Sequence, residues 1–99
     1  MQVVFKDDEL EKFHNEKKNK FRFSRSIQRQ FIIKVNLLKA ANDTRAISAL
    51  AGSLNFEKLK EKRYKGKYSI RINEQRRVII NKKDKPEITL ILEEITDYH

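Results

Sequence analysis

Cysteine and tryptophan are absent from this chain, and its 99 residues include only one proline and two glycines. Without cysteine there is no disulfide, no thiolate metal site and no cysteine nucleophile. Two glycines are too few for a P-loop or a dinucleotide-binding fingerprint, and no serine stands in a Gly-x-Ser-x-Gly elbow. These absences exclude nucleotide-dependent enzymes and most hydrolases with a serine nucleophile.

Long apolar segments and metal-ligand patterns are also missing. No uninterrupted apolar run approaches the roughly 20 residues that span a bilayer, and the first residues do not form a signal peptide. The two histidines, His14 and His99, lie far apart in the sequence. We therefore expect a cytoplasmic protein with one domain over residues 1–99, without a membrane partner, a metal site or a cofactor.

Positive charge is in excess and is unevenly distributed. The chain has 23 Lys and Arg against 14 Asp and Glu, a net charge of +9. Residues 57–85 hold 12 basic and 4 acidic side chains, whereas residues 86–99 hold 4 acidic ones and no Lys or Arg. A basic cluster of this density predicts an anionic partner, namely nucleic acid, a lipid surface or an acidic protein. Phosphate binding is the interpretation that we favour for the cluster.

The first half of the sequence predicts an edge strand followed by two helices. The strand covers residues 2–5, and Asp7 or Asp8 can cap the first helix. Ser24 or Ser26 can cap the second, whose apolar residues recur every three to four positions: Ile27, Phe31, Val35 and Leu38. We expect Asn42-Asp43 to end this helix, and a short helical turn from Thr44 to Ala51 to end at Gly52.

The second half predicts strands. A short strand is expected over residues 56–59, and the alternation of Tyr68, Ile70 and Ile72 predicts a half-buried strand. Residues 76–80 suit a central strand, residues 81–86 a turn, and residues 88–95 a last strand. This order predicts an α+β fold with two N-terminal helices packed on one face of a small, mainly antiparallel sheet.

Three side chains capable of acid–base chemistry or hydrogen bonding end the chain: Asp97, Tyr98 and His99. Histidine exchanges a proton near neutral pH, so this tripeptide is a candidate for general acid–base catalysis. A frayed terminus is the alternative interpretation. The preceding predicted strand weakens that alternative, since it could deliver the tripeptide to the sheet surface.

Two sequence motifs resemble those of the HigB-type toxins of bacterial toxin–antitoxin systems, which belong to the RelE superfamily. The first is KGKYSIRINEQRRVII at residues 65–80, and the second is the terminal EITDYH at residues 94–99. The family pattern runs G-x-x-S-I-R-[IV]-N-x-Q-[WY]-R-[IV], followed by a strand that ends in D-Y-H. The resemblance covers essentially the whole chain, and it implies a RelE-like fold.

The resemblance implies an endoribonuclease, or mRNA interferase, that inhibits translation. Relatives cleave mRNA in the A site of the 30S ribosomal subunit, in contact with ribosomal RNA. The resemblance also implies a metal-independent reaction in which the RNA 2′-hydroxyl attacks the neighbouring phosphate. The family also implies a helix-turn-helix, HigA-like antitoxin as partner, with DNA contacted only through that antitoxin.

The family's functional residues can be carried over to this chain. Arg77 matches the arginine at the scissile phosphate, Lys60 a supporting basic residue, and Asp97, Tyr98 and His99 the catalytic terminus. The remaining basic residues are expected to bind RNA: Lys58, Lys62, Arg63, Lys65, Arg71 and Arg76.

Two positions depart from the family pattern. Glu57 stands where many relatives have a histidine, and it can serve as base or merely occupy the site. Arg76 replaces the usual aromatic residue. An alternative hypothesis is therefore a catalytically weak module that binds RNA or the ribosome and is neutralised by the antitoxin. A third is that the basic face mainly docks an acidic protein.

Overall fold

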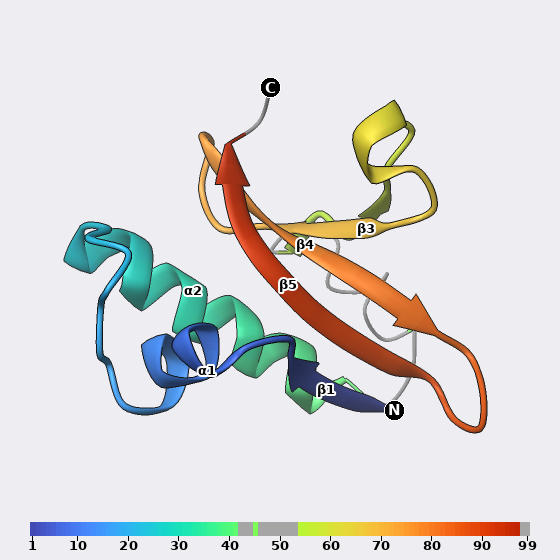
Figure 1. Ribbon diagram of the computed structural model, residues 1–99, viewed down its shortest axis with the longest axis horizontal. Coiled ribbons are helices and arrows are strands. Elements are labelled where there is room, and N and C mark those ends of the chain that lie inside the picture. Colours follow the sequence, from blue (N-terminus) through green and yellow to red (C-terminus); the bar gives the residue numbers. More distant parts are fainter. Residues whose placement is uncertain (42–44, 46–53, 98–99) are drawn as a thin grey trace.

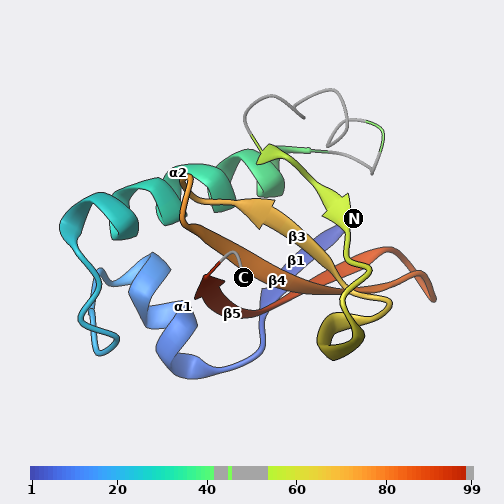
Figure 2. The same ribbon diagram turned by 90° about the horizontal axis from the view of Figure 1, so that it is seen from above.

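The computed structural model describes residues 1–41, 45 and 54–97, which form a helical layer and a sheet (Figure 1). The elements are, in order, β1 (Gln2–Phe5), α1 (Asp8–Asn15), α2 (Arg25–Ala40), β2 (Glu57–Lys58), the 3₁₀ helix η1 (Lys62–Tyr64), β3 (Tyr68–Arg71), β4 (Arg76–Lys83) and β5 (Thr89–Asp97). Both helices lie on one side of the sheet, and Figure 2 shows α2 running along that side. The predicted α+β class is confirmed.

The strand order of the sheet is β1-β5-β4-β3-β2, which places β4 at the centre as predicted. β1 lies at one edge and pairs with β5 in parallel, while the other strand pairs are antiparallel. The prediction of a mainly antiparallel sheet with an edge strand at residues 2–5 is confirmed. β5 lies between β1 and β4, so one of its two edges is paired only through β1.

Side-chain caps fix where both helices begin. The Asp7 carboxylate accepts a hydrogen bond from the Leu10 backbone N–H at 2.9 Å, and the Ser24 hydroxyl accepts one from Ile27 N–H at 3.2 Å. Each cap satisfies a backbone donor that the first helical turn leaves free. Of the alternatives that the sequence left open, the structure uses Asp7 and Ser24.

The main core fills the space between the helices and the sheet. Phe31 and Val35 of α2 and Val78 and Ile80 of β4 are each 0% exposed. The ring of Phe31 lies 5.3 Å from that of Phe13 on α1, measured between centroids. Each such side chain contributes about 1.5–3 kcal/mol through burial, so this core holds the helices on the sheet.

A second, smaller apolar cluster lies on the opposite side of the sheet. It contains Leu59, Tyr64 and Ile79, which are 5%, 7% and 0% exposed. Leu59 follows β2 and Tyr64 belongs to η1, so this cluster attaches the connection between β2 and β3 to the sheet. As a result β4 is buried on both sides, as its β-branched sequence predicted.

The last two strands differ from the sequence prediction. β4 continues to Lys83, because residues 81–83 pair with residues 89–91, so the turn predicted over residues 81–86 is wrong at its start. Ile79 pairs with Glu94 and Ile80 with Leu92, which leaves Glu93 as the extra residue of a β-bulge.

Other boundaries also changed or fall outside the described residues. The strand expected over residues 56–59 is only the two-residue β2. α2 ends at Ala40, ahead of Asn42-Asp43, and that dipeptide, the Thr44–Ala51 turn (apart from Arg45) and Gly52 lie outside the described residues. In the described part of the chain no helix is long and apolar enough to cross a membrane.

Candidate functional site

The side of the sheet opposite the helices carries Arg77, and we call it the open face. Directly paired residues on neighbouring strands point to the same side. Arg77 pairs with Arg71 on β3 and with Thr96 on β5. Along the same face, Ser69 pairs with Ile79 and with Glu57. The register therefore gathers Arg77, Arg71 and Glu57, three of the predicted site residues, on the open face.

Arg77 is held by Glu61. One guanidinium nitrogen, Nη1, lies 2.7 Å from Glu61 Oε1, and Nη2 donates a hydrogen bond to Oε2 at 2.8 Å. The Arg77 side chain is 4% exposed, whereas that of Glu61 is 40% exposed. Two parallel contacts of this kind give an arginine–carboxylate pair a fixed geometry. The pair balances the charge of an arginine that is otherwise shielded from water.

Tyr64 covers the guanidinium of Arg77. The guanidinium carbon lies 5.6 Å from the centre of the tyrosine ring, and that of Arg63 lies 5.0 Å from it. Cations at this distance are attracted by the electron-rich face of the ring. The Tyr64 hydroxyl donates a hydrogen bond to Glu94 on β5 at 2.7 Å. η1 is thereby tied to the sheet above Arg77.

The electrostatics of this cluster act on Glu61. Hydrogen bonding from Arg77, together with the charges of Arg77 and Arg63, lowers the pKa of the Glu61 carboxyl below its ordinary value, although desolvation opposes this. Glu61 is therefore ionised at neutral pH.

A further ion pair lies at the β-bulge. Lys67, which precedes β3, pairs with Glu93, the extra residue of β5. Glu93 and Glu94 thus each bind a residue from the connection between β2 and β3. Two acidic residues in the middle of β5 thus hold this basic connection in place.

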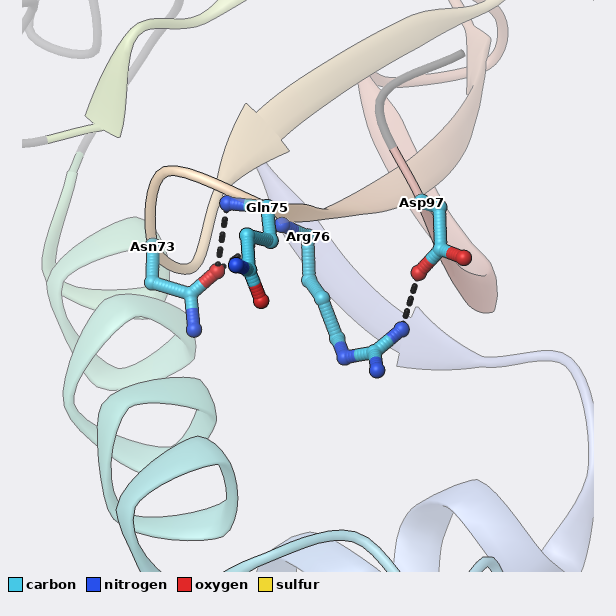
Figure 3. Close-up of polar contacts among 4 residues, drawn as sticks. All are labelled: Asn73, Gln75, Arg76 and Asp97. Atoms are coloured by element: carbon cyan, nitrogen blue, oxygen red, sulfur yellow. Dashed lines mark hydrogen bonds and ion pairs between the residues drawn. The ribbon is translucent and has the colours of Figure 1, made fainter.

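Arg76 and Asp97 meet on the other side of the sheet, where β4 begins and β5 ends (Figure 3). The two residues are paired in register and form an ion pair. The Arg76 guanidinium lies 5.2 Å from the centre of the Phe23 ring, next to the helical layer. Asn73 shapes the preceding turn by accepting hydrogen bonds from the backbone N–H groups of Gln75 and Arg76. The structure therefore does not bring Asp97 and Arg77 together.

The other predicted site residues that the structure describes do not all lie on the open face. Lys58 pairs with Tyr68, whose ring packs on the main core, so Lys58 belongs to the side of the helices. The remaining basic side chains are exposed, either on the connection over Arg77 or on β3: Lys60, Lys62, Arg63, Lys65 and Arg71. Tyr98 and His99 lie outside the described residues.

Glu61, Tyr64 and Glu94 are site residues that sequence reasoning missed. A weak signal was present for the first of them, because Glu61 is the only acidic residue between Lys58 and Asn73. An isolated acid within a basic segment indicates a specific partner, but the sequence does not say which arginine or lysine that partner is.

Metal ligands do not gather in the part of the chain described. Among those residues no group of three or more His, Asp or Glu side chains is placed to hold a metal ion. His14 lies in the helical layer, where its Nε2 is 3.0 Å from Asn36 Oδ1.

Comparison with known proteins gives a family and a fold. The family model of the HigB-like toxin, described as a RelE-like toxin of the type II toxin–antitoxin system HigB, matches residues 3–99. A YoeB/ParE toxin from Agrobacterium tumefaciens superposes over 100% of both chains with a TM-score of 0.58 and 16% identity. A YoeB dimer from Staphylococcus aureus is 24% identical with a TM-score of 0.52, covering 100% of this chain and 97% of its own.

A YoeB–YefM complex from Staphylococcus aureus is also similar, at 24% identity and a TM-score of 0.51, over 100% of this chain and 97% of that one. At these identities the structural likeness supports the RelE-like fold. A search of curated proteins finds no significant match.

Proposed function

Because the chain belongs to the HigB-like family of RelE-like type II toxins, we propose that it is an endoribonuclease that cleaves mRNA on the ribosome. The substrate would be mRNA in the A site of the 30S subunit, and cleavage would stop translation. The attacking group would be the 2′-hydroxyl of the RNA itself, and the proposed reaction uses protein side chains in place of a metal ion.

The reaction needs three catalytic functions from the protein. A base must accept the proton of the 2′-hydroxyl, a cation must stabilise the negative charge that gathers on the phosphate, and an acid must protonate the leaving 5′-oxygen. The products are a 2′,3′-cyclic phosphate and a free 5′-hydroxyl, so that every atom and proton is accounted for.

The position of Arg77 is the observation that carries the proposal. Arginine remains charged and can bind two phosphate oxygens at once. Arg77 lies on the open face under Tyr64, with 4% of its side chain exposed. In such a site, shielded from water, a fixed cation stabilises developing negative charge more strongly than it would in water.

We assign the remaining catalytic roles to residues near Arg77 and to the last three residues of the chain. Glu57 shares the open face with Arg77 and is our candidate for the base, with Lys60 supporting the phosphate. Tyr98 and His99 would supply acid–base function. Asp97, through its ion pair with Arg76, would fix the strand end from which those two residues continue.

Exposed cations near Arg77 would bind the RNA backbone. Those beside it are on the connection between β2 and β3 and on β3 itself: Lys60, Lys62, Arg63, Lys65 and Arg71. Contacts of this kind fix the position of an RNA without selecting its sequence. Arg76 and Lys58, on the other side of the sheet, would reach RNA only at its margin.

We also propose a neutralising partner. One of the structural relatives comes from a YoeB–YefM complex, and the family is one of toxins of type II toxin–antitoxin systems. The partner of this chain would be a HigA-like antitoxin with a helix-turn-helix, and that protein would make any contact with DNA.

Induced expression in bacteria tests the proposal. We expect the full chain to arrest growth and to produce cuts in translated mRNA, which primer extension would locate within codons. A chain ending at Asp97 should be folded by circular dichroism and should no longer arrest growth. Undiminished arrest by that folded, shortened chain would refute the catalytic role of Tyr98 and His99.

A second candidate function is supported by one observation. Both terminal nitrogens of Arg77 are bound by Glu61 in this structure, as expected for a module that binds RNA or the ribosome with weak catalysis. Such a module would associate with ribosomes and produce no cuts. Clear cuts in register with codons would exclude it.

A further inference from the structure

The contact between Glu61 and Arg77 has the geometry of the contact that a phosphate would make. A carboxylate and a phosphodiester each present two oxygens to the edge of a guanidinium. Glu61 places its oxygens 2.7 Å and 2.8 Å from the two terminal nitrogens of Arg77. The carboxylate therefore occupies the edge at which a phosphate would bind.

The position of Glu61 allows its side chain to move away from Arg77. It precedes η1 in the N-cap position, yet its side chain makes no capping hydrogen bond. Its side chain is 40% exposed, against 4% for Arg77. Leu59 and Tyr64 attach the connection to the sheet on either side of it. Rotation of the Glu61 side chain into water therefore needs no change in the apolar cluster.

The surroundings of Glu61 attract polyanions. Its neighbours in sequence are exposed cations, namely Lys60, Lys62 and Arg63. A polyanion that contacts these side chains brings a phosphate next to the Glu61 carboxylate. Repulsion between the two anions then favours rotation of Glu61 away from Arg77.

We propose that the Glu61 carboxylate occupies the phosphate-binding edge of Arg77 in the free protein. A phosphodiester of the bound RNA then displaces this carboxylate and takes its place on Arg77. This inference rests on the proposed function, in which Arg77 contacts the scissile phosphate. It adds a gating residue to the site. It also explains how a cation so little exposed can serve an external ligand.

Binding of a non-cleavable RNA tests the exchange. The probe is a fluorescent 2′-O-methyl oligonucleotide, which lacks the attacking hydroxyl, and anisotropy gives its dissociation constant. Glu61→Gln removes the competing charge but keeps the size of the side chain. We expect this variant to bind on the order of tenfold more tightly than the wild type, because one anion no longer competes.

The matched control is Asp84→Asn. It changes the net charge by the same amount at an exposed carboxylate, which pairs with Lys82 at 3.2 Å outside the Arg77 cluster. We expect an increase in affinity of about twofold or less, from the general change in charge. Equal gains from both variants, or weaker binding by Glu61→Gln, would overturn the exchange. Weaker binding would instead identify Glu61 as a residue that merely positions Arg77.

A double variant separates this inference from the proposed function. Adding Arg77→Gln to Glu61→Gln should remove the gain in affinity, if Arg77 is the phosphate ligand. A double variant that still binds tightly would contradict that role of Arg77, and with it the proposed function. If Arg77→Gln alone weakens binding and Glu61→Gln brings no gain, only the exchange is wrong.

Glu61→Asp covers the case in which Glu61→Gln does not fold. It keeps the charge beside Arg77 but shortens the side chain by one methylene, so the two-oxygen contact is lost. We expect a gain of about threefold in RNA affinity, smaller than that of Glu61→Gln. An affinity no higher than that of the wild type would count against the exchange.

Discussion

Arg76 and Arg77 are neighbours in sequence but act on opposite sides of the sheet. Consecutive residues of a strand point to opposite faces. Arg77 accordingly meets Glu61 on the open face, and Arg76 meets Asp97 beside the helical layer. The motif Arg-Arg thus combines a shielded cation for the candidate site with a cation that fixes the end of β5.

The stability of the Glu61–Arg77 pair should depend on pH. The pKa of Glu61 in the folded protein is lowered from its ordinary value of 4.5 by Arg77 and Arg63. A lowered pKa stabilises the fold above the unfolded value, and this contribution is lost as the pH falls through the lower, folded value. Glu61→Gln lacks the contribution at every pH.

We therefore expect the melting temperature of wild type to exceed that of Glu61→Gln near pH 7, and the difference to shrink below pH 4.5. Thermal unfolding of both proteins over a pH series, followed by circular dichroism, measures it. A difference that stays constant down to pH 3 would show that ionisation of Glu61 does not contribute to stability.

Single residues of the site were only partly predictable. Arg77 was assigned through the family resemblance of the motif at residues 65–80, and the burial of β4 on both faces followed from its β-branched residues. Glu61 could not be assigned, because its partner is 16 positions away and the intervening connection has no periodicity. Contacts between a loop and a strand depend on the folded path of the loop, which local sequence patterns do not encode.

At the scale of elements, α2 and β4 form the scaffold for the site. α2 buries Phe31, Val35 and Leu38 against one face of the sheet. β4 pairs with both β3 and β5, and it carries Arg77 on the other face. The position of Arg77 thus depends on a core from which its own side chain is excluded.

Phe31→Ala should destabilise the protein through this core. Phe31 is 0% exposed and contacts the rings of Phe5 and Phe13, so its removal leaves a cavity and costs about 3–5 kcal/mol. On the same helix, Ile33 is 42% exposed, and Ile33→Ala should cost less than about 1 kcal/mol. Urea denaturation gives both values. Similar losses for the two variants would mean that the core is not where the structure places it.

Elements with a clear period were predicted correctly, and so were the limits of β1 and the caps of both helices, but the ends of several later strands were not. The stripe from Ile27 to Leu38 gave α2, and the alternation from Tyr68 to Ile72 gave β3. The turn expected at residues 81–86 began too early, because polar Asn81, Lys82 and Lys83 extend β4 by pairing with β5. Such hydrogen bonds between strands can keep polar residues in a sheet against their local preference. The parallel pairing of β1 has the same tertiary origin.

At the scale of the whole molecule, the sheet separates two groups of basic residues. One group surrounds the open face, on the connection over Arg77. The other lies on the helical side, where Lys17, Arg25 and Arg29 line a hollow of about 750 Å³ along α2. The basic residues behind the net charge of +9 are therefore divided between the two sides of the sheet. If RNA is the ligand of the open face, only the first group should contact phosphates.

Neutralising each group in turn tests this division. Each phosphate that a cation neutralises on single-stranded RNA contributes about −0.7 to the slope of log K against log salt concentration. We expect the pair Lys62→Gln and Arg63→Gln to reduce the magnitude of that slope by about 1.4. The matched pair Arg25→Gln and Arg29→Gln removes the same charge from the helical side and should leave the slope nearly unchanged. Titration of the 2′-O-methyl probe at several salt concentrations gives the slopes of the wild type and of both double variants.

Equal reductions from the two pairs would mean that RNA binding follows net charge and is not confined to the open face. A reduction from the helical pair alone would place the RNA across α2 and leave Arg77 without a role in binding.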